Sequence, residues 1–270
     1  AKAVRTAAKA MKEVYPEAIV GGPSVTGISK EGTYDTEIGG KTFFEQAMEA
    51  GMWEDVKAVT FHPYVWRVTP EEYMQELEEG LNYYKQEYIK KGVEPPKLWS
   101  TEAGRFTAQS TVGTDKNKGA LVCRQILLMK THDLIDAPFG IFSFDRSGII
   151  DIDQENTYGH VSSGAEGLEK YGTLYYPTEA FLSVAGMNYV MAESEFKEVL
   201  DTANVYMSRY WSDKFNQDII TLHTEKTEES ITLNLGTDNV TLYDEYGNAE
   251  VINSDNGEFQ FDVDTNVSYI

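Results

Sequence analysis

Four short apolar segments recur at nearly regular intervals over the first part of the chain, beginning near residues 18, 58, 97 and 139. Segments with helical spacing of apolar residues lie between them. Strands that alternate with helices are typical of parallel sheets, because two parallel strands need a long crossover connection, which is usually a helix. This rhythm predicts a parallel β/α architecture.

The bounds of the predicted elements follow from apolar periodicity and from the residues that interrupt it. Pro70, Glu71 and Glu72 are typical of a helix start, since proline fits the first turn and acidic groups stabilise the amino end. Gly92 ends the same helix. The predicted helices cover residues 1–15, 42–50, 70–91, 116–132 and 178–189, and the predicted strands cover 18–23, 58–62, 97–101 and 138–145.

After about residue 192 the pattern changes from helical spacing to alternation of apolar and polar residues. Residues 231–235, 240–242 and 259–261 alternate with period two, and turn-forming residues occur at 244–248 and 254–257. This pattern predicts antiparallel strands. We therefore predict two domains, a β/α domain over residues 1–191 and a small β-sandwich of six to eight strands over residues 192–270.

The charge balance narrows the range of partners. The chain has 23 basic and 44 acidic residues, a formal net charge of -21. Such a surface repels phosphate groups, so nucleic acid and anionic membranes are poor candidate partners, whereas neutral ligands such as sugars remain open. No apolar run reaches the roughly 18 residues that a bilayer-spanning helix needs, so no membrane insertion is predicted.

Neither a disulfide nor a metal site is predicted. Cys123 is the only cysteine and lies in an apolar stretch, where we expect a small buried side chain. Acidic residues at 151, 153 and 155 alternate as in a calcium loop, but the glycine that such a loop requires is missing, so a solvated acidic loop is preferred. The histidines have no partners at ligand spacing, and no cofactor is predicted.

Polar and aromatic residues follow the predicted strands at their carboxyl ends, which in β/α proteins face the substrate. Glu102 stands alone after an apolar strand and is followed by Gly104. It could instead be a helix cap or an ion-paired acid, but its neighbours at the other strand ends favour a functional role. These neighbours are His62, Tyr64, Trp66, Arg105, Phe106 and Asp145.

The neighbours of Glu102 differ in how strongly they indicate a function. His62 is as compatible with a satisfied core histidine as with a functional one. Tyr64 is the stronger candidate, because a phenol beside a carboxylate can hold it in a reactive orientation. Trp66 is assigned to the rim and Trp99 to packing. A carboxylate with aromatic and hydroxyl-binding groups on one rim is suited to sugar recognition.

Several motifs occur together in a known order. Val20-Gly21-Gly22-Pro23, Phe61-His62-Pro63-Tyr64, Trp99-Ser100-Thr101-Glu102-Ala103-Gly104 and the segment 139–145 resemble barrel strands five to eight of clan A (TIM-barrel) retaining glycoside hydrolases. The chain is similar in texture to family 39 β-xylosidases and their relatives. The resemblance implies the C-terminal half of a (β/α)8 barrel followed by an antiparallel β-sandwich.

The resemblance also implies roles for individual residues. Glu102 would be the nucleophile of a double-displacement hydrolysis of O-glycosyl bonds, and His62 and Tyr64 would line the sugar subsite. The other predicted substrate-binding residues are Trp66, Arg105, Phe106, Phe144 and Asp145. The acid/base Glu of such enzymes follows an Asn at the end of strand four, and this sequence contains no Asn-Glu pair. We therefore expect the acid/base residue to lie upstream, in a missing N-terminal half of the same protein, and this part alone to be inactive.

One departure from the family pattern supports an alternative. Ser143-Phe144 occupies the region where these enzymes commonly carry a Trp beneath the sugar. Phe144 can serve as an apolar platform, but the chain could also be a non-catalytic carbohydrate-binding or surface-scaffold protein with a decayed barrel. A hydrolase on an unrelated α/β fold is disfavoured, because no Gly-x-Ser-x-Gly motif occurs. A bacterial origin is expected, and secretion is slightly favoured over the cytoplasm.

Overall fold

The computed structural model describes residues 2–25, 46–47, 49–64, 68–92, 94–101, 115–132, 161–163, 175–200 and 202–270. These residues fall into two compact units. The first unit contains a helix–sheet layer from the first 101 residues, and the second contains two helices and the antiparallel strands of the C-terminal part. The predicted domain boundary at 191/192 and the half-barrel remain predictions.

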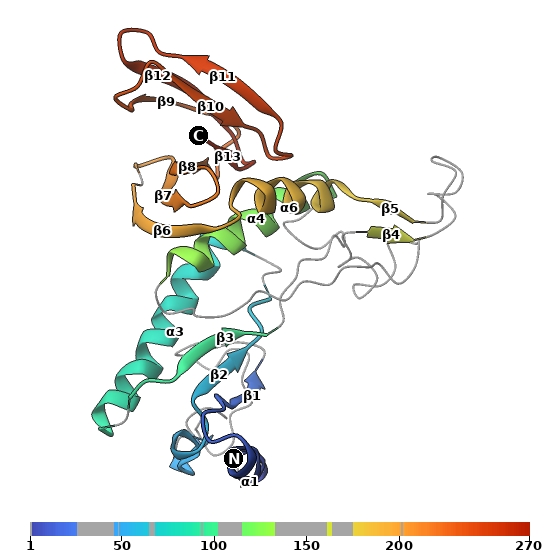
Figure 1. Ribbon diagram of the computed structural model, residues 1–270, viewed down its shortest axis with the longest axis vertical. Helices are drawn as coiled ribbons and strands as arrows, with labels where there is room; N and C mark the ends of the chain where they lie inside the picture. Colours follow the sequence, from blue (N-terminus) through green and yellow to red (C-terminus); the bar gives the residue numbers. More distant parts are fainter. Residues whose placement is uncertain are drawn as a thin grey trace. The chain divides into compact units, whose positions relative to one another are not determined.

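The first unit is built on a three-stranded parallel sheet in the order β1-β2-β3 (Figure 1). The strands are β1 (Gly21–Val25), β2 (Ala58–Phe61) and β3 (Lys97–Ser100), and helix α3 (Pro70–Lys90) connects the last two. Parallel pairing of these three predicted segments is confirmed. β1 begins later than predicted, because ladder pairing starts only where Gly21 meets the first residue of β2.

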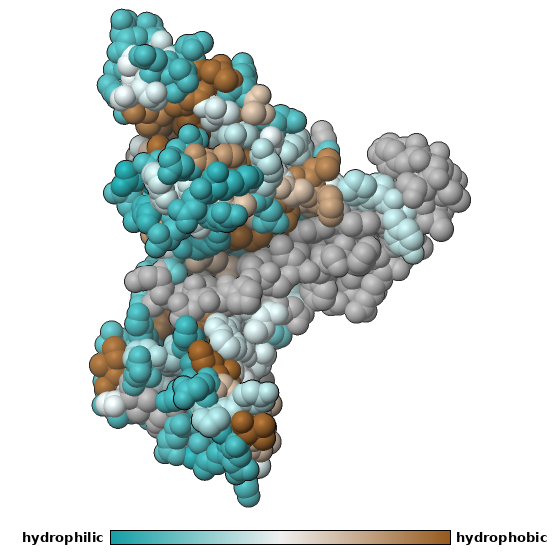
Figure 2. Space-filling model, in the orientation of Figure 1, coloured by the Kyte–Doolittle hydropathy of each residue, from teal (hydrophilic) through white to brown (hydrophobic). Residues whose placement is uncertain are grey.

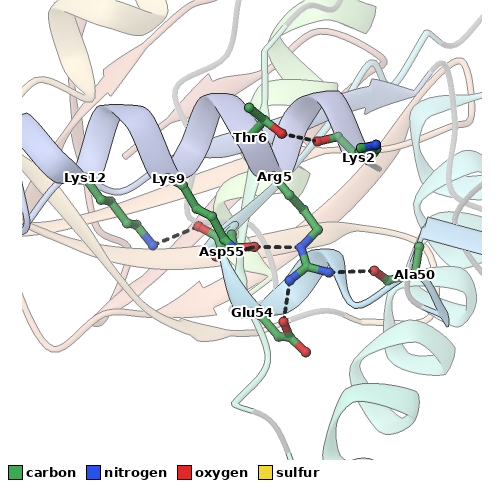
Figure 3. Close-up of polar contacts among 8 residues, drawn as sticks. All are labelled: Lys2, Arg5, Thr6, Lys9, Lys12, Ala50, Glu54 and Asp55. Atoms are coloured by element: carbon green, nitrogen blue, oxygen red, sulfur yellow. Dashed lines mark hydrogen bonds and ion pairs between the residues drawn. The ribbon is translucent and has the colours of Figure 1, made fainter.

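Ion pairs fix helix α1 (Lys2–Val14) at the amino end of β2 (Figure 3). Arg5 Nε donates to Asp55 Oδ2 at 2.6 Å, Arg5 Nη1 donates to the Ala50 carbonyl at 3.0 Å, and Arg5 also pairs with Glu54. Lys12 Nζ donates to the Asp55 carbonyl at 2.8 Å. The hydrogen bond from Arg5 lowers the pKa of Asp55. We interpret this cluster as structural, because it precedes β2 and lies at the strand end opposite the predicted site.

Helix α1 contributes little of its surface to the core. Ala8 packs with Ala47, Met52 and Val56, where Met52 belongs to the short 3-10 helix η1 (Met52–Glu54). Met11 and Val14 on the same helix are exposed, and so is Tyr15 directly after it, the last two at 73%. The unit therefore has an apolar helix surface that the described residues leave uncovered.

In the second unit, helices α4 (Asp115–Thr131) and α6 (Glu179–Val190) pack closely against each other. Gly119 permits this approach, because a Cβ there would lie 2.3 Å from Ser183 Oγ and 3.1 Å from the Ala180 Cα. Thr178 caps α6 through a hydrogen bond accepted from the Phe181 N–H. Both helices match their predicted ranges to within a residue or two.

The antiparallel strands of the second unit form a six-stranded sheet in the order β11-β10-β13-β8-β7-β6, and a two-stranded sheet of β12 and β9 (Figure 1). All pairs are antiparallel, which confirms the predicted antiparallel module. The strands are β6 (Ser194–Val199), β7 (Tyr206–Ser212), β8 (Gln217–His223), β9 (Glu229–Asn234), β10 (Asn239–Tyr243), β11 (Ala249–Asn253), β12 (Glu258–Val263) and β13 (Ser268–Tyr269). A separate two-stranded antiparallel sheet consists of β4 (Val161–Ser163) and β5 (Tyr175–Pro177).

The two faces of the six-stranded sheet have different coverings. One face carries Tyr210, Ile219 and Tyr269, which pack against Cys123 of α4 and Met187 of α6. The other face carries Met207 and Leu222, which pack against Phe259 and Phe261 of β12. Cys123 is buried and unpaired with another cysteine, as predicted, and burial raises the pKa of its thiol.

Hydrophilic residues cover most of the described surface on the face drawn in Figure 2, in keeping with the charged composition. No helix within the described ranges combines the length and apolar character needed to cross a bilayer.

Candidate functional site

The carboxyl edge of the parallel sheet brings together three hydroxyl groups from three strands. Ser24 Oγ lies 2.8 Å from Thr60 Oγ1 and 3.4 Å from Thr101 Oγ1. The register places Ser24 beside Thr60 in neighbouring strands, and Thr101 directly follows β3. Ser24 and Thr101 are exposed, whereas Thr60 is buried. The edge thus presents hydrogen-bonding groups held in position by one another.

The chain stays in register with β2 up to the residue before Glu102. Thr101 N donates to the Phe61 carbonyl at 3.1 Å, which continues the β2–β3 ladder by one residue. Glu102 itself lies outside the described residues. Its predicted role as a nucleophile therefore stays a prediction, and the last described hydrogen bond of the preceding strand is made by Thr101.

His62 and Tyr64 follow β2 at the same edge. Their rings meet edge to face, with centroids 6.2 Å apart and an interplanar angle of 88°. Tyr64 N donates to the His62 carbonyl at 2.9 Å around the buried Pro63, which forms a tight turn. Both side chains are half-buried. The structure thus places these two predicted residues together, and their contact with sugar remains a prediction.

Trp99 acts as packing beneath this edge, as the sequence predicts. Its ring lies over Gly21 of β1, so closely that a Cβ on Gly21 would come within 3.0 Å of two ring carbons and 3.1 Å of the Thr60 methyl. In the register Trp99 also pairs with Thr60. The indole therefore braces all three strands, and Gly21 is required for its position.

The remaining predicted site residues lie outside the described residues. These are Trp66, Arg105, Phe106, Phe144 and Asp145, together with Glu102. The sequence interpretation did not single out Ser24, Thr60 and Thr101, although Thr101 belongs to the Thr-Glu-x-Gly motif. Small hydroxyl residues at the ends of apolar strands were the available signal. Within the described ranges no three His, Cys, Asp or Glu side chains gather as a metal ion would require.

Two solved structures of glycosidases are similar in fold to this chain. A family 39 glycoside hydrolase from the gut symbiont Bacteroides cellulosilyticus WH2 aligns with a TM-score of 0.67 and 18% sequence identity, over 84% of this chain and 46% of that chain. A glucosidase from Croceicoccus marinus aligns with a TM-score of 0.61 and 11% identity, over 98% of this chain and 62% of that chain. The chain has a glycoside hydrolase-like fold.

At 18% and 11% identity, these comparisons show a similar fold only. A shared fold does not by itself specify the chemistry of a site. The chain spans only 46% and 62% of these two glycosidases. No protein-family model and no curated protein matches the sequence. The glycoside hydrolase-like fold nevertheless agrees with the resemblance that the strand-end motifs indicate, and it focuses functional interpretation on the carboxyl edge of the parallel sheet.

Proposed function

We propose that this chain is the nucleophile-bearing part of a retaining glycoside hydrolase, with Glu102 as the nucleophile. The observation that carries the proposal is the carboxyl edge of β1, β2 and β3. There Thr101 remains paired with β2 one residue before Glu102, and the turn after β2 holds His62 against Tyr64. The glycosidase neighbours in fold support the same assignment.

The mechanism follows from the chemistry of two carboxyl groups. Retaining glycosidases place them about 5–5.5 Å apart, one as nucleophile and the other as acid and then base. Glu102 would attack the anomeric carbon as the acid protonates the departing oxygen, and water would then hydrolyse the glycosyl–enzyme ester. Ser24, Thr101, His62 and Tyr64 would bind sugar hydroxyls and orient the carboxylate.

The acid/base group is proposed to come from the missing N-terminal half of the same protein. Two observations support this arrangement. Within the described residues β1 pairs with β2 alone, which leaves one strand edge open, and Val14 at the end of α1 and the following Tyr15 are exposed. A further part of the protein would cover both surfaces and supply the second carboxyl group.

Glu102→Gln is the direct test, applied to the longer protein with aryl glycosides as substrates. Because Gln cannot form the glycosyl ester, the hydrolysis rate should fall by at least about 10³-fold with little change in thermal stability. A slow substrate such as a 2-deoxy-2-fluoroglycoside should label the wild-type peptide that contains Glu102, as detected by mass spectrometry. Labelling of another peptide, or an unchanged rate in the variant, would refute the assignment.

The same assays separate the catalytic proposal from the alternative of a non-catalytic carbohydrate-binding protein. Ser143-Phe144, in place of the Trp common in the resembled enzymes, favours that alternative. Oligosaccharides that bind the longer protein without any turnover would support it. Measurable turnover abolished by Glu102→Gln would exclude it.

A further inference from the structure

A groove lies on the six-stranded sheet of the second unit, on the face that carries Met207 and Leu222. Its volume is about 570 Å³, within the range of about 300–1,000 Å³ that is usual for small-molecule sites. The groove runs between strands β6, β7 and β8 and the turn from β9 to β10. It lies in a different unit from the carboxyl edge of β1, β2 and β3.

Sheet geometry explains why the groove exists. Strands lie about 4.8 Å apart, so the six-stranded sheet is roughly 29 Å wide and the two strands β9 and β12 span only about 10 Å. These two strands pack on Met207 and Leu222, and the groove lies on the part of this face lined by β6, β7, β8, β10 and the β9–β10 turn. Apolar residues such as Leu200 and Ile220 form part of its lining.

Charged side chains line one side of the groove, and one indole lies beside them. Arg209 lines the groove, with Nη2 2.6 Å from Glu198 Oε1 and Nη1 3.6 Å from Asp218 Oδ2. Trp211 flanks the groove without being one of its lining residues. It lies two residues beyond Arg209 on the same face of β7, directly opposite the lining residue Asp218 in the β7–β8 ladder. The indole is half-buried, and its Nε1 donates to Asp213 Oδ1 at 2.9 Å, which fixes the ring orientation.

The opposite side of the groove supplies amide and hydroxyl groups. Asn234, Thr237, Asn239 and Thr241 line it. Two of them are held by the β9–β10 turn itself, since Asn234 Oδ1 accepts from the Gly236 N–H at 3.2 Å and Thr237 Oγ1 donates to the Asn239 carbonyl at 3.1 Å. The groove therefore offers many hydrogen-bonding groups in positions set by backbone structure.

This chemistry discriminates between classes of ligand. Two carboxylates against one guanidinium leave the groove with net negative charge, and the whole chain carries -21, so an anionic ligand is repelled. A purely apolar ligand would bury these charges without replacing their hydration, which is costly. A neutral polyhydroxylated ligand can stack its C–H face on the indole and exchange hydrogen bonds with the carboxylates, the guanidinium and the amides.

We propose that this groove is a second, non-catalytic binding site for a neutral oligosaccharide chain. Trp211, which flanks the groove beside Asp218, is the stacking platform, and Arg209, Asp218 and Glu198 are the hydroxyl-binding groups. The site does not depend on Glu102 or on catalysis by the first unit. It would hold a polymeric carbohydrate to the protein independently of any hydrolysis.

The test uses the full 270-residue chain and affinity electrophoresis in gels that contain one neutral polysaccharide each: arabinoxylan, glucomannan, galactan, hydroxyethylcellulose or starch. Polygalacturonate serves as the anionic probe. At least one neutral polymer should retard the chain, whereas polygalacturonate should not. Calorimetry with the matching hexasaccharide then gives the affinity. Absence of binding to every neutral polymer, or stronger binding to polygalacturonate, would overturn the proposal.

Variants locate the binding on the chain. Trp211→Ala should weaken binding by at least about tenfold, Arg209→Ala should weaken it severalfold, and Trp211→Phe should retain most of it because the aromatic face remains. Tyr15→Ala, which removes an exposed aromatic from the other unit, is the matched control and should bind as the wild type does. Thermal melting of each variant confirms that it is folded.

Tyr64→Ala distinguishes the groove from the carboxyl edge of the parallel sheet. Binding that is lost in Tyr64→Ala and unchanged in Trp211→Ala would place the sugar in the first unit and refute the groove. In the longer protein, Trp211→Ala should leave turnover of small aryl glycosides unchanged while reducing binding to polymer. If the Glu102 assignment fails, the binding measurements on Trp211→Ala and Tyr64→Ala still test the groove, because they do not depend on hydrolysis.

Discussion

Trp99 and Gly21 illustrate how single residues control the parallel sheet. The indole occupies space that every residue other than glycine would fill at position 21, since a Cβ there would lie 3.0 Å from two ring carbons. Substitution must displace Trp99 or part β1 from β2. Because the hydroxyl contacts of Ser24 with Thr60 and Thr101 depend on that pairing, the candidate site should be sensitive to position 21.

We predict that Gly21→Val destabilises the chain by about 1–3 kcal/mol, the usual cost of overpacking a close contact. The measurement is chemical denaturation, with Trp99→Leu as the second variant. When Trp99 is already replaced by Leu, Gly21→Val should lower the free energy of unfolding by less, because the smaller Leu side chain leaves room for Val. Equal costs in both backgrounds would show that the contact with Trp99 does not limit position 21.

Glu245 is a second residue with a defined energetic effect. Burial raises the pKa of its carboxyl group, and neighbouring carboxylates at 179, 244 and 264 raise it further, whereas a hydrogen bond from Tyr246 lowers it. A carboxyl group with a pKa raised in the folded state binds its proton more tightly there than in the unfolded chain. Its contribution to stability is therefore greatest below pH 4.5, its ordinary pKa, and is lost as pH rises through the folded-state pKa.

Glu245→Gln removes this ionisation while it keeps a group that can accept the hydrogen bond from Tyr246. The variant should melt at a higher temperature than the wild type at pH 7, and the difference should narrow toward pH 4. Differential scanning calorimetry across this range measures it. A difference that is the same at pH 4 and pH 7 would contradict the assigned cause.

At the scale of elements, helix α6 is fixed by its contact with the turn between β10 and β11. Gly186 faces that turn, and a Cβ there would lie 2.5 Å from the Tyr246 carbonyl carbon and 2.7 Å from the Glu245 carbonyl oxygen. These are backbone atoms, so the clash cannot be relieved by rotation of a side chain. The helix and the sheet can reach this separation only with glycine at position 186.

We therefore predict that Gly186→Ala destabilises the protein, by about 1–3 kcal/mol. Intrinsic helix propensity predicts the opposite sign, since alanine in a helix interior is favoured over glycine by about 1 kcal/mol. Asn188→Ala, at an exposed position of the same helix, is the control and should be neutral or slightly stabilising. Denaturant unfolding of both variants gives the result, and a more stable Gly186→Ala would exclude the close contact.

At the scale of the whole molecule, the edge of β1 that has no partner among the described residues and the exposed apolar surface of α1 bear on activity. If, as proposed, a further N-terminal part of the same protein supplies the acid/base carboxyl group, this chain alone cannot protonate the leaving group. We expect no hydrolysis of alkyl or oligosaccharide substrates by the chain alone. Co-expression with the upstream polypeptide should restore turnover, measured by release of reducing sugar. Turnover by the chain alone would refute the division of the two carboxyl groups.

Much of the architecture followed from local patterns. Apolar spacing predicted α1, α3, α4 and α6 closely, because helical periodicity is set by neighbours three and four residues apart. Alternation after residue 192 predicted antiparallel strands, because successive side chains of a strand point to opposite faces of a sheet, which is also a local property. The sequence placed the start of β1 at residue 18, whereas the strand begins at Gly21. Its start is set by pairing of Gly21 with Ala58, the first residue of β2, which lies 37 residues further along the chain.

The sequence by itself determined that the first part is parallel β/α, that the last part is antiparallel, and that a lone carboxylate, Glu102, follows an apolar strand. Only the tertiary structure decided which side chains meet. It placed Ser24 within 3.4 Å of Thr101, 77 residues later, and put Trp211 opposite Asp218 beside a groove. The physical reason is that periodicity is a local property of the chain, whereas register and the relative widths of two packed sheets arise from contacts between distant segments.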